Sequence, residues 1–272
     1  NVFQNPFSKK IIDTFEYPFY DINKNSSTAI SLNFSRLERL RPGYGYSKLP
    51  DQSINNKNSS DEGLIIYDLK NKNIKKIINL EEISNVRSNS DMINAEHYFN
   101  HVSFSPYSNH FIFFHLWTES KKRFRRLFIY NEDKEELELL SNNPVSHYSW
   151  KNADEILITE LNNKVLKYNL YNISSKELLT IGDDMLTEDG HPSFIDDTKI
   201  ITDTYPNLFG YQRLLRFDIF KKELLSIGKF YSPSKFTFDN KCDLHPRLNR
   251  NKNVACVDSG SVGRREMILL EI

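Results

Sequence analysis

The sequence is poor in cysteine, glycine and proline, and it carries no net charge. Two cysteines, Cys242 and Cys256, occur in 272 residues, too few for a disulfide framework and typical of a reducing compartment. The scarcity of glycine and proline we attribute to base composition. Lysine plus arginine and aspartate plus glutamate each number 36, a balance that gives no reason to expect nucleic acid or an anionic membrane as a partner.

Long hydrophobic runs are also missing. No apolar stretch approaches the roughly 18 residues that a membrane span needs, and no charged-then-apolar leader is visible. We therefore expect a soluble, cytoplasmic protein without a membrane partner. The sequence begins at Asn1 rather than at a methionine, so a secreted or periplasmic location stays open if a signal has been removed.

The most informative feature that the sequence does contain is an internal repeat. Four segments start with a histidine, continue with a large apolar residue three positions later and a polar turn, and end in a β-branched and aromatic run. They are HVSFSPYSNHFIFFHLW from His101, HYSWKNADEILITEL from His147, HPSFIDDTKIITDTYP from His191 and HPRLNRNKNVACVDSG from His245. The starts lie 46, 44 and 54 residues apart, which is about the length of one four-stranded propeller blade.

Further strands complete each repeat. An earlier unit fits the pattern with Phe19 in place of the histidine, and every unit is followed by a third strand such as LIIYDL (64–69) or RLFIYN (126–131). We predict an all-β protein, a β-propeller of four-stranded antiparallel blades that forms a single domain over residues 1–272. The five visible blades are expected near residues 19–80, 101–141, 147–182, 191–228 and 245–272.

The remaining segments are expected to connect or complete these blades. Residues 1–16 form either the end of a preceding blade or a strand that closes the ring, and we favour the preceding blade of a seven-bladed ring. The irregular segment 35–62 contains Gly, Pro, Asn and Ser and is expected to be a surface loop. Residues 80–98 are expected to hold a short helix.

The shared position of the histidines suggests a site. Residues at the same register of successive inner strands surround the axis of a propeller, so His101, His147, His191 and His245 are expected to converge near one mouth of the channel. Neutral imidazoles ringed by carboxylates suit a divalent ion or an anionic substrate. A structural role, in which each histidine caps backbone groups or bonds a neighbouring blade, stays open. His97 and His110 lie outside the register and are expected at the surface or in turns.

The segments NHVSFSP, SHYSW, DGHPSF and DLHPRL resemble the blade starts of the oligogalacturonate lyase-like propellers, relatives of the TolB and WD40-like repeat propellers. The resemblance runs from about residue 17 to the end. It implies seven blades and a divalent metal, most often manganese and otherwise magnesium or calcium, that binds a uronate before β-elimination. The implied metal ligands are His147, Asn240, Asp243 and His245. Asn240 and Asp243 stand where the family has glutamine and histidine.

The resemblance also implies a role in catalysis for one residue, His101, and the chemistry and position of other residues suggest further candidates. His101 matches the position of the proton-abstracting base. Arg36 and Arg213 are candidates to pair with a substrate carboxylate, because a guanidinium binds a carboxylate through two hydrogen bonds; surface salt bridges are the alternative role. The candidate substrate contacts are His191, His115, Trp117, Tyr44, Tyr46, Asp203, Tyr205 and Arg264.

Two functions follow from this pattern. The first is lyase action on a uronate-containing oligosaccharide, and the second is a propeller without catalysis that binds a glycan or a protein through the same face. The departures at Asn240 and Asp243 favour the second. The propeller of a serine peptidase is disfavoured because the sequence contains no GxSxG motif.

Overall fold

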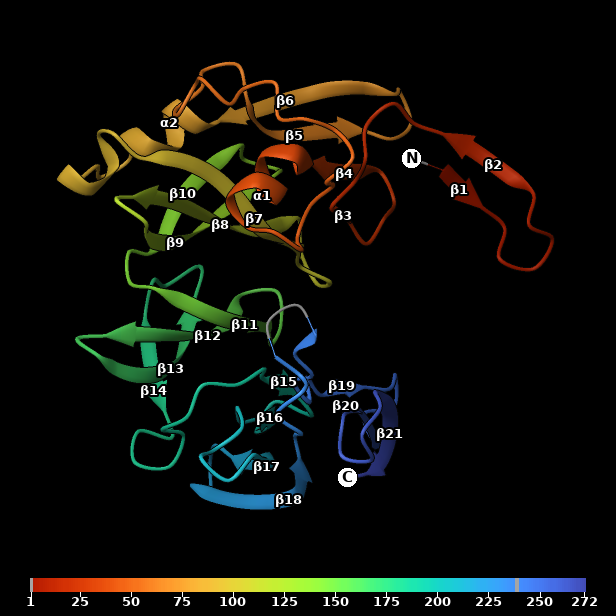
Figure 1. Cartoon of the computed structure of the whole chain (residues 1–272), viewed down its shortest axis with the longest axis vertical. Helices are drawn as coiled ribbons and strands as arrows, with labels where there is room; N and C mark the ends of the chain where they lie inside the picture. The colour runs from red at the N-terminus through yellow and green to blue at the C-terminus, as the bar shows by residue number, and fades with distance from the viewer. Residues whose placement is uncertain (1, 238–239) are drawn as a thin grey trace. The chain divides into compact units, whose positions relative to one another are not determined.

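The computed structural model describes residues 2–237 and 240–272, which belong to two compact units, unit 1 (Asn1–Asn142) and unit 2 (Asn143–Ile272). Within these residues the structure consists almost entirely of antiparallel sheets whose strands follow one another in sequence order (Figure 1). Unit 1 contains the helices α1 (Phe34–Leu40) and α2 (Leu80–Asn85) and the 3-10 helix η1 (Ser90–Met92).

Unit 1 contains a hairpin and two four-stranded sheets. The hairpin is β1 (Val2–Gln4) and β2 (Ile11–Thr14). The first sheet is β3 (Asp21–Ile22), β4 (Thr28–Ser31), β5 (Gly63–Asp68) and β6 (Asn73–Asn79). The second is β7 (Glu96–Phe104), β8 (His110–Glu119), β9 (Lys122–Asn131) and β10 (Glu136–Ser141).

Unit 2 contains two four-stranded sheets and one sheet of three strands. The first is β11 (Val145–Trp150), β12 (Glu155–Asn162), β13 (Val165–Asn172) and β14 (Leu178–Ile181). The second is β15 (Ser193–Phe194), β16 (Lys199–Asp203), β17 (Tyr211–Asp218) and β18 (Glu223–Tyr231). The third is β19 (Arg247–Leu248), β20 (Val254–Ser259) and β21 (Glu266–Glu271).

The second strand of each four-stranded sheet is largely buried on both faces. Along β8 every residue from Phe111 to Trp117 is buried, so the strand reads as a continuous apolar run rather than as an alternation. Burying one such phenylalanine stabilises the fold by roughly 1.5–3 kcal/mol. Inner strands of neighbouring sheets lie side by side, β3 with β7 and β11 with β15, and Asp21 Oδ2 accepts a hydrogen bond from the Phe104 N–H at 2.8 Å.

One turn repeats between the third and fourth strands of all four four-stranded sheets. The Asp or Asn that ends the third strand accepts hydrogen bonds from the N–H groups two and three residues later, and the residue after those has a positive φ. The pairs are Asp68 with Lys72, Asn131 with Glu135, Asn172 with Lys176 and Asp218 with Lys222, with φ between 51° and 64°. Because Asp and Asn side chains can mimic a backbone turn, this short pattern fixes the register of the outer hairpin.

The segment 35–62, expected as a surface loop, is partly helical and partly buried. Asn33 caps α1 by accepting a hydrogen bond from the Arg36 N–H at 2.9 Å, as asparagine does at many helix starts. Gly45 is needed behind the helix, because a Cβ there would lie 2.1 Å from the Phe34 carbonyl oxygen. In the neighbouring segment, α2 and η1 provide the short helix expected within residues 80–98, but β7 already begins at Glu96.

The histidine register coincides with irregular backbone. His101 and His245 have φ of 51° and 45°, values in the left-handed region that few non-glycine residues adopt. The pairing of β7 with β8 shifts between Asn100 and Ser103, and that of β11 with β12 shifts between Val145 and His147. The inner strands therefore bulge where the histidines lie, and bulges often re-aim side chains next to functional sites.

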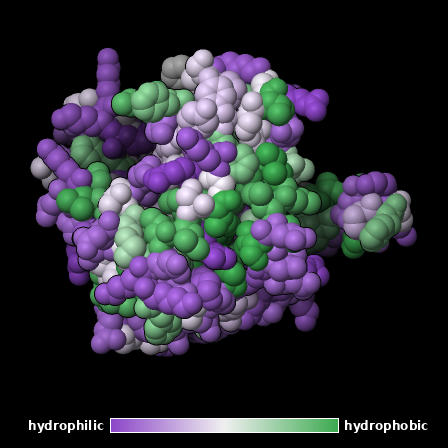
Figure 2. Space-filling view, turned by 90° about the horizontal axis from the view of Figure 1, so that it is seen from below, coloured by the Kyte–Doolittle hydropathy of each residue, from purple (hydrophilic) through white to green (hydrophobic). Residues whose placement is uncertain are grey.

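Apolar side chains interrupt the hydrophilic surface seen in Figure 2. Among the described residues, the turn between β16 and β17 exposes Leu208 and Phe209, which are 102% and 80% accessible. Asn207 fixes this turn, because its side chain accepts hydrogen bonds from the Phe209 and Tyr211 N–H groups, each at 3.0 Å. In the described part of the chain, no helix has the length and apolar character needed to cross a bilayer.

Candidate functional site

Unit 2 brings three of the four repeat histidines together. The ring centroids of His147 and His191 are 4.1 Å apart, and those of His191 and His245 are also 4.1 Å apart. The Tyr205 ring lies beside them, 5.9 Å from the His191 ring and 6.4 Å from the His147 ring. These three imidazoles, contributed by the starts of three successive inner strands, form the histidine cluster.

A carboxylate orients His147. Its Nδ1 lies 3.1 Å from Asp189 Oδ1, and the same oxygen accepts hydrogen bonds from Ser146 Oγ at 2.7 Å and from the Gly190 N–H at 3.0 Å. Burial acts to raise the pKa of Asp189, but the hydrogen bonds and charge of these partners, His147 first, outweigh it, and the pKa lies below its ordinary value. Asp189 is therefore an ionised acceptor that fixes the His147 ring.

A second carboxylate holds both His191 and His245. Asp203 is buried, and both of its oxygens lie 3.0 Å from His191 Nδ1. It also accepts the backbone N–H of His191 at 2.6 Å and that of His245 at 2.8 Å. Burial acts to raise the pKa of Asp203, but His191 and the two N–H groups outweigh burial and lower it. Asp203 thus links two blade starts through one carboxylate.

These contacts fix which ring nitrogens carry protons. An ionised carboxylate only accepts hydrogen bonds, so Nδ1 of His147 and of His191 carries the proton and Nε2 keeps a lone pair when the ring is neutral. Burial, followed by the neighbouring His191, lowers the pKa of His245 and favours its neutral form. The cluster therefore offers basic nitrogens, which can accept a proton or ligate a metal ion.

A pocket of about 470 Å³ adjoins the cluster in unit 2, within the range of small-ligand sites. It is lined by Lys241, Cys242, Asp243, His245, Asp258, Arg265, Glu266 and Met267. Of the lining residues, Lys241 pairs with Asp243, Nζ to Oδ2 at 3.2 Å, and Asp258 pairs with Arg247, which lies outside the lining, at 2.8 Å. Cys242 is buried beneath the pocket wall, and burial raises the pKa of its thiol, so it behaves as an inert core residue.

The predicted metal ligands do not form a preassembled site. No group of three or more His, Cys, Asp or Glu side chains in residues 2–237 and 240–272 is arranged to hold a metal ion. Of the oxygen donors, Asn240 is exposed, and Asp243 gives one oxygen to the Lys241 ammonium. A carboxylate that is already paired with a cation is a poor additional ligand for a divalent ion, so the donor set present here does not fit the metal implied by the resemblance.

Arg213 lies near the cluster and is paired. Its guanidinium forms an ion pair with Glu188, the residue that precedes Asp189, and the Arg213 N–H donates to Thr204 Oγ1 at 3.0 Å. Its side chain is 42% exposed, and exposed pairs of this kind are worth about 1 kcal/mol or less. Arg213 can therefore exchange Glu188 for a ligand carboxylate. Arg264 is exposed on the turn between β20 and β21.

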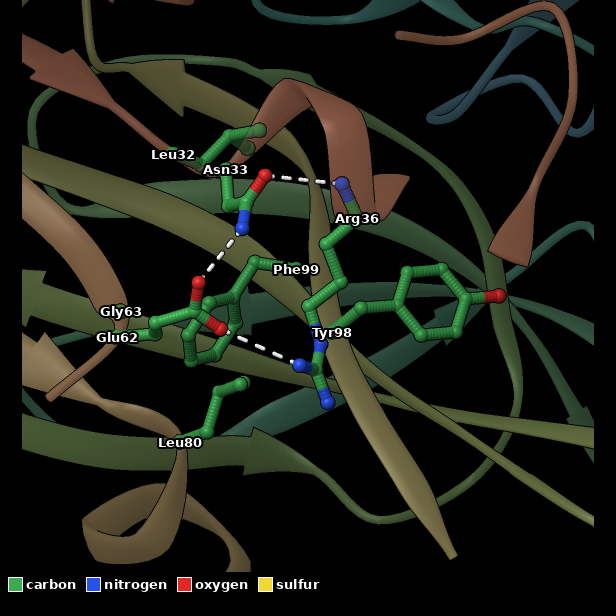
Figure 3. Close-up of a pocket in the computed structure, with 8 residues that line it drawn as sticks. All are labelled: Leu32, Asn33, Arg36, Glu62, Gly63, Leu80, Tyr98 and Phe99. Carbon is green, nitrogen blue, oxygen red and sulfur yellow. Dashed lines mark hydrogen bonds and ion pairs between the residues drawn. The ribbon is translucent and has the colours of Figure 1, made fainter. Parts of the chain in front are cut away.

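Arg36 is a structural residue of unit 1 (Figure 3). Its buried guanidinium donates to the His97, Asn56 and Lys57 carbonyl oxygens at 2.7–2.9 Å and contacts Glu62 Oε2 at 3.2 Å. The cavity beside it measures only about 10 Å³, about the space of one water molecule. The predicted role of Arg36 in substrate binding is therefore not supported, because its donors fasten the segment that precedes β5.

His115 and Trp117 lie in the core of unit 1 rather than at a solvent-facing site. Trp117 is 4% exposed and stacks on Phe124 with ring centroids 5.4 Å apart. His115 is fully buried, and so is His97, for which the prediction of a surface position was wrong. The strand β7 begins before the repeat register and carries His97 inside the sheet.

These two histidines form a buried hydrogen-bond chain with Arg126. Arg126 Nε donates to His115 Nδ1 at 3.0 Å, so His115 Nε2 carries the proton and donates to His97 Nδ1 at 2.8 Å. His97 Nε2 then donates to the Met92 carbonyl oxygen at 2.9 Å. Burial lowers the pKa of both histidines and lowers that of Arg126 to about 10. Arg126 also donates to the Ile83 and Val86 carbonyl oxygens, both at 2.6 Å, at the end of α2.

His101, Tyr44 and Tyr46 belong to unit 1. The His101 ring stacks on Phe114 with centroids 4.9 Å apart, and the Tyr44 ring lies 5.9 Å away. Tyr44 is 44% exposed and carries the Arg41 guanidinium 4.4 Å above its ring. Tyr46 stacks on Phe34 at 4.6 Å. This arrangement offers flat apolar faces of the kind that pack on sugar rings, and the role of His101 as a base stays a prediction.

The residues of unit 2 missed at the sequence level are Asp189, Ser146 and Lys241. Asp203 was predicted, but as a substrate contact rather than as the carboxylate that holds His191. Asp189 and Lys241 each lie two residues from a predicted site residue, in EDGHPSF and NKCDLHP. The signal was an acidic residue beside a repeat histidine, which fits the common pairing of a functional imidazole with a carboxylate. Ser146 precedes His147 directly, and only the structure shows that it holds Asp189.

Comparison with known proteins identifies the fold that contains this site. No protein-family model and no curated protein sequence matches the chain. Among solved structures it is similar to an oligogalacturonate lyase in complex with manganese (TM-score 0.69, 12% identity, 99% of this chain and 70% of that chain). It is also similar to an oligogalacturonate lyase from Vibrio parahaemolyticus (TM-score 0.65, 13% identity, 99% and 71%) and to TolB from Acinetobacter baumannii (TM-score 0.50, 11% identity, 96% and 54%). Sequence identities this low do not show that the chain shares the activity of these proteins. The structural similarity agrees with the sheets described above, and the chain is an all-β protein with the β-propeller fold, built of four-stranded antiparallel blades.

Proposed function

We propose that the protein binds uronate-containing oligosaccharides at the histidine cluster of unit 2 and cleaves them by β-elimination. The observation that carries this proposal is the pair of carboxylate-held imidazoles, His147 with Asp189 and His191 with Asp203. The likeness of the fold to two oligogalacturonate lyases supports the substrate class. The adjoining pocket of about 470 Å³ offers room for a sugar unit.

The chemistry follows from the state of the rings. In a neutral His191, Asp203 holds the proton on Nδ1 and keeps the ring oriented, and Nε2 accepts the proton from the carbon next to the uronate carboxylate. The electron pair of that C–H bond forms a carbon–carbon double bond, the bond to the glycosidic oxygen breaks, and the leaving oxygen takes up a proton from solvent. His191 with its buried carboxylate is favoured as the base because Asp203 also stabilises the imidazolium that forms.

The carboxylate of the substrate needs a positive counterpart as charge builds on it. A divalent metal supplies this in the chemistry implied by the resemblance, but the donor set described above does not fit one, so the metal takes no part in the proposed step. The cationic groups of this chain that lie at the pocket are Lys241 and Arg265. Arg213 is a further candidate if its exposed pair with Glu188 opens.

A matched set of variants tests the proposal. The assay incubates purified protein with trigalacturonate and follows the ultraviolet absorbance of the unsaturated uronate product. We expect His191→Ala to lower product formation at least about 100-fold, the lower range for general-base catalysis, while His110→Ala, which removes a histidine outside the cluster, leaves it unchanged. Product formation that is lost in His101→Ala but kept in His191→Ala would contradict the assignment of the base.

A second function is favoured by one specific observation. Because Lys241, paired with Asp243 at the pocket, offers a cation for a uronate carboxylate without any proton transfer at the histidines, the same site also suits a propeller that binds the glycan without cleaving it. Calorimetric titration of trigalacturonate separates the two functions. Binding without any unsaturated product identifies the binding module, and release of product identifies the lyase.

A further inference from the structure

Lys241 is held in a defined position at the mouth of the pocket. Its ammonium lies 3.2 Å from Asp243 Oδ2 and 3.7 Å above the centroid of the Tyr205 ring. A cation this close to an aromatic face is attracted by the ring quadrupole. Arg265 fixes the backbone beside it by donating a hydrogen bond to the Lys241 carbonyl oxygen. Lys241 therefore combines two side-chain partners with an anchored main chain, unlike an ordinary surface lysine.

The position of Lys241 is the place where the resemblance implies a metal. Asp243 is one of the implied ligands, and it gives Oδ2 to the ammonium. Its other oxygen, Oδ1, is buried and has no hydrogen-bond partner among the described residues. The Lys241 ammonium thus already pairs with the Asp243 carboxylate, which a divalent ion would need as a ligand.

Lys241 also retains capacity to bind a ligand. An ammonium has three N–H donors, of which Asp243 takes one, and the side chain is 46% exposed. His245 lines the same pocket and packs against His191, and the Tyr205 ring beneath the ammonium lies 5.9 Å from the His191 ring. A carboxylate at Lys241 therefore lies next to the basic nitrogens of the cluster.

We propose that Lys241 is the built-in cation of this site and binds the uronate carboxylate in place of a divalent metal. This inference rests on the proposed function for its substrate class, but the exclusion of metal by the ammonium does not depend on catalysis. It assigns Asp243 as the residue that positions Lys241, Tyr205 as the face that supports it, and Arg265 as the anchor of its backbone.

The test removes the charge of the Lys241 side chain and keeps most of its aliphatic part. Lys241→Met is compared with Lys241→Arg, which retains a cation, and with Lys229→Met, a matched control whose ammonium lies 4.1 Å above the Tyr211 ring elsewhere in unit 2. Trigalacturonate affinity is measured by calorimetry on protein treated with a chelator, and Mn²⁺ affinity is measured by electron paramagnetic resonance. Circular dichroism confirms that each variant is folded.

The expected pattern is specific to the ammonium. The chelator leaves trigalacturonate binding by the original protein unchanged, and Lys241→Met weakens it about tenfold or more, as expected for loss of a charge-assisted hydrogen bond. Lys241→Arg and Lys229→Met stay within about threefold of the original protein. Mn²⁺ binding becomes at least about tenfold tighter in Lys241→Met because Asp243 is released, and Asp243→Asn added to that variant reverses the gain.

Two results overturn the inference. The first is that the original protein loses trigalacturonate binding when the chelator is added and regains it with Mn²⁺. The second is that the original protein and Lys241→Met bind Mn²⁺ with equal affinity. If trigalacturonate does not bind the original protein at all, the proposed function fails. The Mn²⁺ comparison still decides separately whether Lys241 occupies the position of the cation.

Discussion

At the scale of single residues, the same amino acid has two opposite environments in this chain. His147 and His191 of the cluster face ionised carboxylates, Asp189 and Asp203, which favour a proton on Nδ1. His97 and His115 instead face each other and Arg126, without a carboxylate in the described hydrogen bonds of their chain. Histidine therefore serves as a basic group in unit 2 and as a neutral hydrogen-bonding core residue in unit 1.

The buried chain of unit 1 predicts a loss of stability in mild acid. The pKa of His97 and of His115 is lowered in the folded state, whereas an unfolded histidine titrates near about 6.5. Below that pH the unfolded chain binds protons that the folded chain does not, so stability is full above about 6.5 and falls as the pH drops, by at most about 1.4 kcal/mol per pH unit for each group.

Urea unfolding at pH 7.5 and pH 5.5 measures this effect. We expect His115→Gln to reduce the difference between the two pH values, because the amide accepts from Arg126 and donates to His97 without titrating. His110→Gln, which changes a half-buried histidine whose Nδ1 lies 3.0 Å from Ser108 Oγ, serves as the control. An unchanged difference in His115→Gln would mean that other groups cause the acid sensitivity.

At the scale of elements, the repeated turn after the third strand combines a favourable side chain with a strained backbone. Asp218 accepts the Phe220 and Lys221 N–H groups at 3.1 and 2.9 Å, and Lys222 then adopts φ of 51°. A side chain in the left-handed region costs about 1–2 kcal/mol relative to one in the right-handed region. Glycine avoids that cost, although it loses more entropy on folding.

This turn gives a prediction with a built-in control. Lys222→Gly is expected to raise the free energy of unfolding by up to about 1 kcal/mol, whereas Lys221→Gly, one position earlier and without a positive φ, lowers it by about 0.5–1 kcal/mol. Chemical denaturation of the two variants side by side gives the comparison. Equal changes in both would show that backbone strain at Lys222 is not the cause.

Much of the element-level structure could be predicted from the sequence, since the strands alternate or run apolar at regular spacing. The third strands expected at 64–69 and 126–131 are β5 and β9. The helix α1 could not be predicted, because Asn33 is an unremarkable residue in a Gly- and Ser-rich segment until its side chain caps Arg36. The buried Arg36 depends on carbonyl groups from distant residues. The pairing of Lys241 with Asp243 depends on the irregular backbone before β19, which periodicity does not describe.

At the scale of the whole molecule, the chain offers one spectroscopic reporter for each unit. The sequence contains two tryptophans, Trp117 in unit 1 and Trp150 in unit 2, and both are largely buried. Each unit has its own apolar clusters, such as Met92, Ala95 and Trp117 in unit 1 and Ile201, Leu214 and Val257 in unit 2.

The two tryptophans allow the acid effect to be assigned to a unit. In Trp150→Phe the remaining fluorescence reports unit 1, and we expect its urea midpoint to fall between pH 7.5 and pH 5.5. In Trp117→Phe the signal of unit 2 is expected to change less, because the pKa of one cluster histidine, His245, is lowered there, whereas the pKa values of two histidines, His97 and His115, are lowered in unit 1. A larger acid shift in the Trp150 signal than in the Trp117 signal would contradict the origin of the effect in His97 and His115.

The turn that carries Leu208 and Phe209 has a practical consequence for handling the protein. Both side chains are accessible at the tip of a short hairpin connection, the kind of site where proteases cut first. A brief digestion with chymotrypsin, which cleaves after large apolar residues, is therefore expected to nick the chain there before it reaches the buried strands. Replacing both residues with serine removes that cleavage point and gives a more durable sample for titration and crystal growth.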